Sequence, residues 1–315
     1  MEPNVKIENQ KSPIEVPKPK KTLKQSTKDH ISGYLYISPF FVLFGIFGVF
    51  PIIFTAYISF HKWNILGTRE FVGLSNYQNL LSDPLFWKAL GNTMSIWILS
   101  TIPQLAMALI LAFVLNQAFL KGKQFFRLAI FLPNITSVVA VSIVFGAIFG
   151  QHYGIINYLL SFLGVDPINW RTSYLGAHVA IASMVIWRWV GYNAIIYLAA
   201  LQSIPNDLYE AATIDGANKA QQFLYITIPM IRPMIIFTII LSTIGGMQIF
   251  AEPQTFLGNG GGAMNQGLTL TLYLYEEAFV RNSFGYASSV AWLLFIIIVI
   301  FSLINLYFSN KIKSA

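Results

Sequence analysis

Long apolar segments separated by short polar ones run through most of the chain. Charged residues are absent between Lys88 and Lys121, between Arg127 and Asp166, and between Arg281 and Lys311. Crossing the hydrocarbon core of a membrane as a helix takes about 20 consecutive, mostly apolar residues. The pattern therefore predicts six transmembrane helices, at roughly 33–60, 91–116, 126–150, 177–201, 231–251 and 286–309.

Composition supports a membrane protein. Of the 315 residues, 55% are hydrophobic and only 10% are charged, whereas soluble domains carry about 25% charged residues. We therefore expect an all-α membrane protein with six transmembrane helices. There is no cysteine, which excludes disulfides and thiolate metal sites, and the four histidines lack metal-site spacing.

The net charge of +7 is concentrated at the N-terminus, where seven lysines lie within residues 1–30. Prolines and few apolar residues accompany them, which is typical of disorder. We interpret residues 1–30 as a disordered basic cytoplasmic tail rather than a nucleic-acid-binding segment, and residues 31–315 as one membrane domain.

Orientation follows from the loops, because cytoplasmic loops carry an excess of Lys and Arg. With the N-terminus inside, fourteen basic residues fall inside and five outside. Both termini are then cytoplasmic in a multi-pass protein of the cell membrane. The inner set is the seven tail lysines with Lys121, Lys123, Arg127, Lys219, Arg232, Lys311 and Lys313, and the outer set is Lys62, Arg69, Lys88, Arg171 and Arg281.

A polar island at about 203–230 separates the fourth and fifth spans on the predicted inner side. Ser203 or Asn206 is suited to cap a short helix there, and Gly216 permits the positive φ that ends it. A second short helix from Asn218 to Tyr225 would stop at Pro229. The segment therefore predicts a helix-turn-helix elbow, a shape suited to docking rather than to catalysis.

This island resembles the coupling motif of ABC importer permeases. The matching positions are a Glu-Ala-Ala triplet, a glycine six residues after the Glu, and an Ile-x-x-Pro in which this chain has Ile228 where the family prefers Leu. The resemblance implies the type I importer transmembrane fold (MetI-like), with the elbow docked on an ATP-hydrolysing subunit. The residues concerned are Glu210, Ala211, Ala212, Asp215, Gly216, Ile226 and Pro229.

Two outer segments resemble the carbohydrate-uptake, maltose-permease-like branch of that family. One is the first outer loop, Phe71–Leu81, and the other runs from Thr269 to Ala287. The Gly-Gly-Pro of the family is Gly261-Gly262-Ala263 here, so that turn lacks its proline. The resemblance implies passage of a sugar, of di- or oligosaccharide size, delivered by an extracytoplasmic binding protein.

The fourth span contains polar and aromatic residues at mid-membrane, where a charge costs roughly 2.5–3.5 kcal/mol on insertion scales. Tryptophan rings stack on sugars and polar groups bind hydroxyls, so these residues suit a substrate pathway; the resemblance implies sugar contacts near Tyr192. Alternatively, Arg188 holds a neighbouring subunit or caps carbonyls while the tryptophans pack. The candidates are Trp187, Arg188, Trp189, Tyr192 and Asn193.

Further pathway candidates are Ser242 and Gln248 in the fifth span and Asn134 in the third. A glutamine in mid-span is costly unless it is paired or wetted, although Ser242 alternatively bonds to its own helix. Gly245-Gly246 would kink the fifth span, and Pro133-Asn134 would kink the third.

The resemblance implies four kinds of partner: a second similar permease subunit, two ATP-binding subunits, a binding protein and membrane lipid. ATP and Mg²⁺ would be bound by the partner subunits, because this chain has no phosphate-binding motif; we expect no enzyme activity, no resident cofactor and no metal. Alternatives are a permease for another polar solute such as glycerol phosphate, a secondary transporter, or a membrane enzyme acting on lipid. No acidic residue lies well inside a predicted span, which disfavours a secondary transporter.

Overall fold

The computed structural model describes residues 23–64, 67, 69–117 and 121–313. Backbone contacts divide the chain into two units, residues 1–54 and 55–315. The first unit contains α1 (Leu23–Phe44), the π-helical turn η1 (Gly45–Val49) and the start of α2 (Phe50–Ser59). Helix α1 begins inside the segment expected to be disordered, and the remainder of that segment lies outside the described residues.

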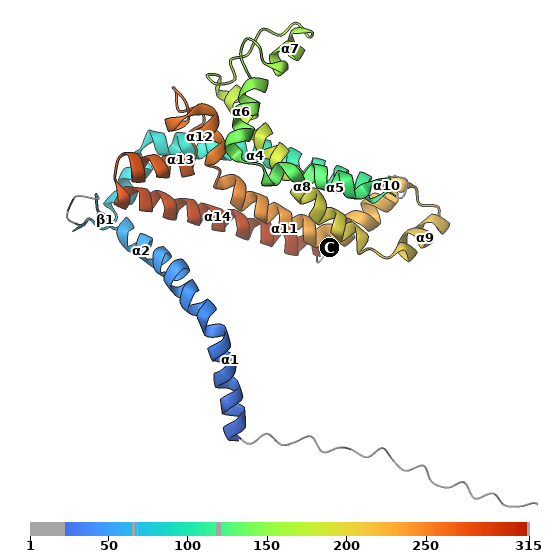
Figure 1. The fold of residues 1–315 in the computed structure, drawn as a ribbon, viewed down its shortest axis with the longest axis horizontal. Coiled ribbons are helices and arrows are strands. Elements are labelled where there is room, and N and C mark those ends of the chain that lie inside the picture. The colour runs from blue at the N-terminus through green and yellow to red at the C-terminus, as the bar shows by residue number, and fades with distance from the viewer. Residues whose placement is uncertain (1–22, 65–66, 68, 118–120, 314–315) are drawn as a thin grey trace, which may run out of the picture. The chain divides into compact units, whose positions relative to one another are not determined.

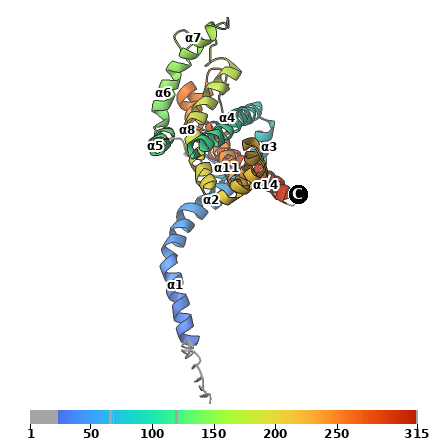
Figure 2. The same ribbon diagram turned by 90° about the vertical axis from the view of Figure 1, so that its right-hand side faces the viewer.

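The second unit is built on long helices that run lengthwise beside one another (Figure 1). Helix α4 packs along α8, and α11 contacts α4, α8 and α14. Figure 2 shows α5, α6 and α7 along one side of this unit and α14 on the other. These long helices are α4 (Pro84–Asn116), α5 (Lys123–Ile135), α8 (Tyr174–Gln202), α11 (Ile228–Met247) and α14 (Phe284–Lys313), and α6 (Val138–Ile148) leaves α5 at a sharp angle.

Small residues let these helices approach closely. Buried alanines, including Ala108 on α4 and Ala194 on α8, lie where the helices meet. A side chain at Gly191 would overlap the carbonyl oxygen of Ile130, so α5 and α8 touch there through their backbones. In lipid, helix association depends on such close packing rather than on the hydrophobic effect.

Shorter elements fill the two ends of the unit. At one end, α9 (Asn206–Ile214) and α10 (Lys219–Gln222) precede the π-helical turn η2 (Phe223–Thr227) and α11 (Figure 1). The others are the antiparallel pair β1 (His61–Lys62) and β2 (Glu70–Phe71), with His61 opposite Phe71, then α3 (Ser75–Ser82), α7 (Ile155–Ser161), α12 (Ala251–Leu257), η3 (Asn259–Gly261), α13 (Leu270–Tyr275) and η4 (Glu276–Val280).

The third predicted span is not one helix. Helices α5 and α6 meet at a bend of 97°, centred on Thr136 and Ser137, which are extended. Pro133 lacks a backbone donor, and the hydroxyl of Thr136 donates to the carbonyl of Leu132 at 2.9 Å. Local side-chain bonding of this kind competes with the helical ladder, so the break follows Pro133-Asn134 rather than kinking the helix there.

The fifth span also differs from the prediction. It begins at Lys219 and continues to Met247, so Pro229 does not end a helix. Pro229 is the second residue of α11, where the missing N–H is tolerated, and η2 absorbs the change of register. Gly245 and Gly246 do not kink the span: α11 ends just after them, where the N–H of Gln248 donates to the carbonyl of Gly245 at 3.2 Å.

Candidate functional site

A cavity of about 530 Å³ opens between α4, α8, α11 and α12. On α8 it is lined by residues near the middle of a 29-residue helix, which is where transporters of other folds place solute sites, near the bilayer midplane. Six of the eight predicted pathway residues line this cavity: Arg188, Trp189, Tyr192, Asn193, Ser242 and Gln248.

The α8 side of the cavity is aromatic and polar. The rings of Trp189 and Tyr192 meet edge to face with centroids 5.6 Å apart. Asn193 is 2% exposed, and its amide donates to the carbonyl of Trp189 at 3.2 Å. Trp189 and Tyr192 therefore present ring surface to the cavity, while much of Asn193 is engaged with its own helix.

Two predicted pathway residues do not line this cavity. Trp187 is exposed and its ring lies 5.9 Å from that of Phe145 on α6, because successive helical residues point about 100° apart. Asn134 on α5 has a buried amide nitrogen with no hydrogen-bond partner among the described residues. Trp187 therefore points away from the cavity.

The sequence analysis missed the contribution of α4. Thr101 and Gln104 line the cavity, and the amide of Gln104 donates to the hydroxyl of Ser242 at 3.4 Å. Both residues lie in the middle of a span without charges. Gln248 was predicted because a polar amide at mid-membrane needs a partner. Gln104 could have been predicted for the same reason.

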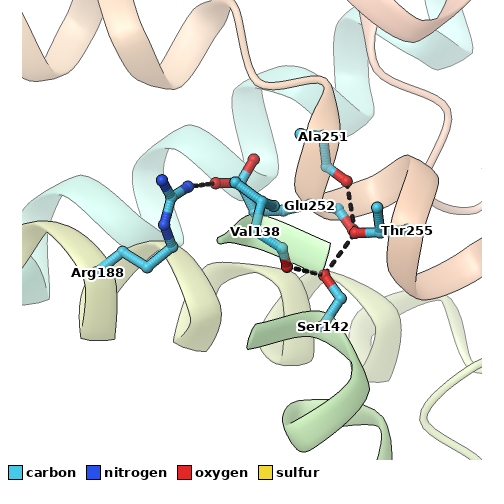
Figure 3. A network of polar contacts seen from close by, with 6 residues as sticks. All are labelled: Val138, Ser142, Arg188, Ala251, Glu252 and Thr255. Atoms are coloured by element: carbon cyan, nitrogen blue, oxygen red, sulfur yellow. Dashed lines mark hydrogen bonds and ion pairs between the residues drawn. The ribbon is translucent and has the colours of Figure 1, made fainter. Parts of the chain in front are cut away.

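Arg188 has its charge partner within this chain. Its guanidinium nitrogen Nη1 donates to Oε1 of Glu252 at 2.5 Å, and the two side chains are 12% and 8% exposed (Figure 3). The sequence placed Glu252 at the end of the fifth span, but α11 ends at Met247 and α12 brings the buried Glu252 against α8. Both groups lose water in this position, and each compensates the charge of the other.

The predicted elbow is present between α8 and α11. Helix α9 ends before Gly216, whose φ is +82°, a value open to glycine without strain. Pro205, not Ser203 or Asn206, occupies the N-cap of α9, and no side chain caps it. Helix α10 is capped by Asn218 through a capping box with Gln221.

Two side-chain bonds close the elbow from within. Tyr209 and Thr227 are joined through their hydroxyls, and the amide of the buried Gln222 donates to the hydroxyl of Thr213 at 2.8 Å. Glu210, Ala211, Asp215, Gly216 and Pro229 are exposed, whereas Ala212 and Ile226 are partly buried. The outer surface of the elbow also exposes apolar side chains, among them Leu208, Ile214 and Tyr225.

Comparison with known proteins identifies the family. The family described as "Binding-protein-dependent transport system inner membrane component" matches residues 88–314. The chain belongs to this family. It is an integral inner membrane protein and a permease subunit of an ABC importer.

Curated relatives of the permease come from carbohydrate-uptake systems. It is 38% identical over 286 residues to a lactose transport system permease of Rhizobium radiobacter, covering 90% of this chain and 95% of that one. It is 37% identical over 281 residues to an arabinooligosaccharides transport permease of Bacillus subtilis (strain 168), covering 89% of each. A trehalose/maltose transport permease of Thermococcus litoralis is 31% identical over 286 residues, covering 90% and 96%.

The permease also shares its fold with a solved importer. A chain of a bacterial alginate ABC transporter, crystallised with an alginate pentasaccharide-bound periplasmic protein, superposes with a TM-score of 0.79 at 23% identity. The match covers 92% of this chain and 98% of that chain. The fold is therefore that of a type I ABC importer transmembrane domain.

A second polar site lies at the end of the unit opposite the elbow. Here a pocket of about 560 Å³ is lined by residues that include Asp83, Tyr273, Glu277, Arg281 and Tyr286. Oδ2 of Asp83 accepts from the hydroxyls of Tyr273 at 2.5 Å and Tyr286 at 3.0 Å. Arg281 donates to Glu277 at 2.7 Å.

The pKa values of two carboxyl groups of this pocket, Asp83 and Glu277, are shifted in opposite directions. Burial raises the pKa of Asp83, but the hydrogen bonds from Tyr273, the backbone of Leu85 and Tyr286 outweigh it, so the pKa lies below its ordinary value. Burial raises the pKa of Glu277, and the nearby Arg281 offsets this only in part. Asp83 is therefore the ionised anchor of this end of the permease.

Proposed function

We propose that this permease forms half of the translocation pathway for a sugar of di- or oligosaccharide size. An extracytoplasmic binding protein would deliver the sugar to the outer side. The names of the relatives support this substrate class. The cavity supports it too, because ring faces from Trp189 and Tyr192 suit sugar rings and neutral polar groups from Gln104 and Ser242 suit hydroxyls.

One observation carries the mechanism: the two helices that lead into the elbow also line the cavity. Helix α8 supplies Tyr192, which lies about ten residues or roughly 15 Å before the end of the helix at Gln202, where the elbow begins. Helix α11 supplies Ser242 and follows the elbow. Movement of the elbow would therefore be transmitted along both helices to the cavity walls.

The elbow is the proposed docking site for an ATP-binding subunit. Its exposed apolar side chains, such as Ile214 at 86% exposed, are suited to a protein cleft rather than to water. The complete importer would contain a second similar permease and two ATP-binding subunits. ATP and Mg²⁺ would be held by those subunits, and this chain would perform no hydrolysis.

We also propose the orientation of the permease in the membrane. The excess of basic residues on one side, fourteen against five, supports cytoplasmic termini and a cytoplasmic elbow. The pocket around Asp83 would then face the binding protein. Residues 203–230 would form the coupling loop within a transmembrane domain of residues 31–315.

The test is reconstitution of the permease with its candidate partner subunits in proteoliposomes. We expect a binding protein to stimulate ATP hydrolysis and to permit ATP-dependent uptake of labelled lactose, maltose or an arabinooligosaccharide. ATP hydrolysis without uptake of any of these sugars, but with uptake of glycerol phosphate, would assign a different solute. Uptake driven by a proton or sodium gradient without ATP would contradict the proposal.

A further inference from the structure

The charged residues of the cavity form a closed pair. Among the described residues that line it, only Arg188 and Glu252 carry a formal charge, and they are bound to each other at 2.5 Å. The other polar lining groups, such as Thr101, Gln104 and Gln248, are neutral. The net charge of this lining is therefore zero.

The carboxylate is held in place by its helix. Helix α12 is tied to α6 by a short hydrogen bond between the hydroxyls of Thr255 and Ser142. The Ser142 hydroxyl also lies 2.9 Å from the carbonyl oxygen of Val138 and the Thr255 hydroxyl lies 2.6 Å from that of Ala251, so one hydroxyl donates to the other and the second donates to its own helix (Figure 3). These contacts hold the first turn of α12, which carries Glu252, against α6.

We infer that the Arg188–Glu252 pair makes this cavity selective for uncharged sugars over sugars that carry a carboxylate. The inference rests on the proposed function. An acidic sugar must give up water on entering, and the positive charge of Arg188 is already compensated by the carboxylate of Glu252. A neutral sugar only exchanges water hydrogen bonds for those of the neutral lining groups.

The first test compares uptake of lactose and maltose with uptake of the same sugars after oxidation of one hydroxymethyl group to a carboxylate. Wild type and variants receive the same binding protein, so its preference cancels when their acidic-to-neutral uptake ratios are compared. Equilibrium binding of the same sugars to the purified complex without binding protein gives a second ratio. Glu252→Gln leaves Arg188 unpaired, and we expect both ratios to rise at least about tenfold, equivalent to about 1.4 kcal/mol.

Removing one partner of a buried pair can prevent folding, so two further sets of variants keep the test decisive. Gln248 is exposed in the cavity and leaves the pair intact when replaced. Gln248→Lys should raise the ratio and Gln248→Glu should lower it. The double variant Arg188→Gln/Glu252→Gln removes both charges, and its ratio should return towards that of the wild type.

Asp166→Asn is the matched control, because Asp166 is an exposed carboxylate that does not line the cavity. A change of ratio with Glu252→Gln or Gln248→Lys, but not with Asp166→Asn, supports the inference. Uptake of neutral sugar with an unchanged acidic-to-neutral uptake ratio in all cavity variants would overturn this inference but not the proposed function. Failure of the wild type to take up or bind either form of either sugar would instead overturn the proposed function.

Discussion

The hydroxyl groups of Tyr209 and Thr227 lie 2.9 Å apart and join α9 to η2 across the elbow. Thr227 is buried, and its hydroxyl also donates to the carbonyl of Gln222 at 3.4 Å. The bond holds the two arms of the elbow at a fixed angle. We therefore expect this bond to help transmit movement of α9 to α11.

This relationship predicts the effect of Tyr209→Phe. Loss of the hydrogen bond should cost about 1 kcal/mol locally and should lower the amount of sugar imported per ATP hydrolysed, because the elbow arms can then move separately. Parallel measurement of uptake and ATP hydrolysis in proteoliposomes checks this. Tyr158→Phe, which changes an exposed tyrosine of α7, is the control; an unaltered ratio for Tyr209→Phe would show that the bond does not carry coupling.

A second prediction concerns the turn of the elbow. Gly216→Pro should abolish transport while the permease remains in the membrane, because proline cannot adopt a φ of +82°. Gly216→Asn should retain much of the transport, since asparagine tolerates this conformation better than other residues.

Glu210→Lys should also abolish transport by reversing an exposed charge on the proposed docking surface. Uptake assays combined with co-purification of the ATP-binding subunits distinguish lost coupling from lost assembly, and normal uptake by both Gly216→Pro and Glu210→Lys would refute the elbow assignment.

A third prediction concerns the cavity wall. Tyr192→Ala removes a ring that lines the cavity, and we expect sugar uptake to fall about tenfold with assembly intact. Trp187→Ala removes a larger ring outside the cavity and should leave the preference among sugars unchanged. Uptake is measured per assembled complex for several sugars. Equal effects of the two variants on sugar preference would place the site elsewhere.

A fourth prediction concerns topology, and the absence of native cysteine makes it simple to test. Single cysteines at the exposed positions Gln151 and Asp166 should react with a membrane-impermeant reagent from outside, and one at Lys219 should not. Labelling of intact cells before and after permeabilisation provides the measurement. The reverse pattern would place the elbow outside and exclude its contact with an ATP-binding subunit.

A fifth prediction follows from the opposite pKa shifts at the outer pocket. The pKa of Asp83 is lowered in the folded state, so its ionised form stabilises the fold above its ordinary pKa near 3.8, and this contribution is lost as the pH falls through the lowered pKa. Asp83→Asn should therefore destabilise the permease by about 1–3 kcal/mol at neutral pH. The difference from wild type should shrink as the pH falls below about 3.8.

The pKa of Glu277 is shifted in the opposite direction to that of Asp83, so its effect on stability depends on pH in the opposite way. Its pKa is raised in the folded state, so it favours folding below its ordinary pKa near 4.5 and opposes folding as the pH rises through the raised value. Wild type should therefore lose stability relative to Glu277→Gln as the pH rises above about 4.5, whereas it loses stability relative to Asp83→Asn as the pH falls below about 3.8. Thermal unfolding in detergent at several pH values measures both, and parallel pH trends for the two variants would contradict the assignment of the anchor to Asp83.

The sequence determined the class of this protein and the position of its elbow. Apolar runs of sufficient length predict spanning helices because an unpaired backbone group in lipid is costly, and these signals are local. The elbow was equally local: Gly216 and the capping residue Asn218 lie within the segment that they shape. Arg188, Tyr192 and Ser242 could also be predicted from the sequence, because a polar residue in the middle of an apolar span is easily recognised.

Only the tertiary structure decided what those groups contact. Glu252 lies 64 residues after Arg188 and Ser242 lies 138 residues after Gln104, and no periodicity within one span encodes such pairs. The bend after Asn134 and the end of α11 at Met247 turn neighbouring segments back into the unit, which places α12 beside α8. Side-chain partners across helices depend on the packing of whole helices, whose orientation is fixed by contacts such as that of Gly191 with Ile130. For that reason the sequence identified the polar residues of this cavity but not the closed charge pair within it.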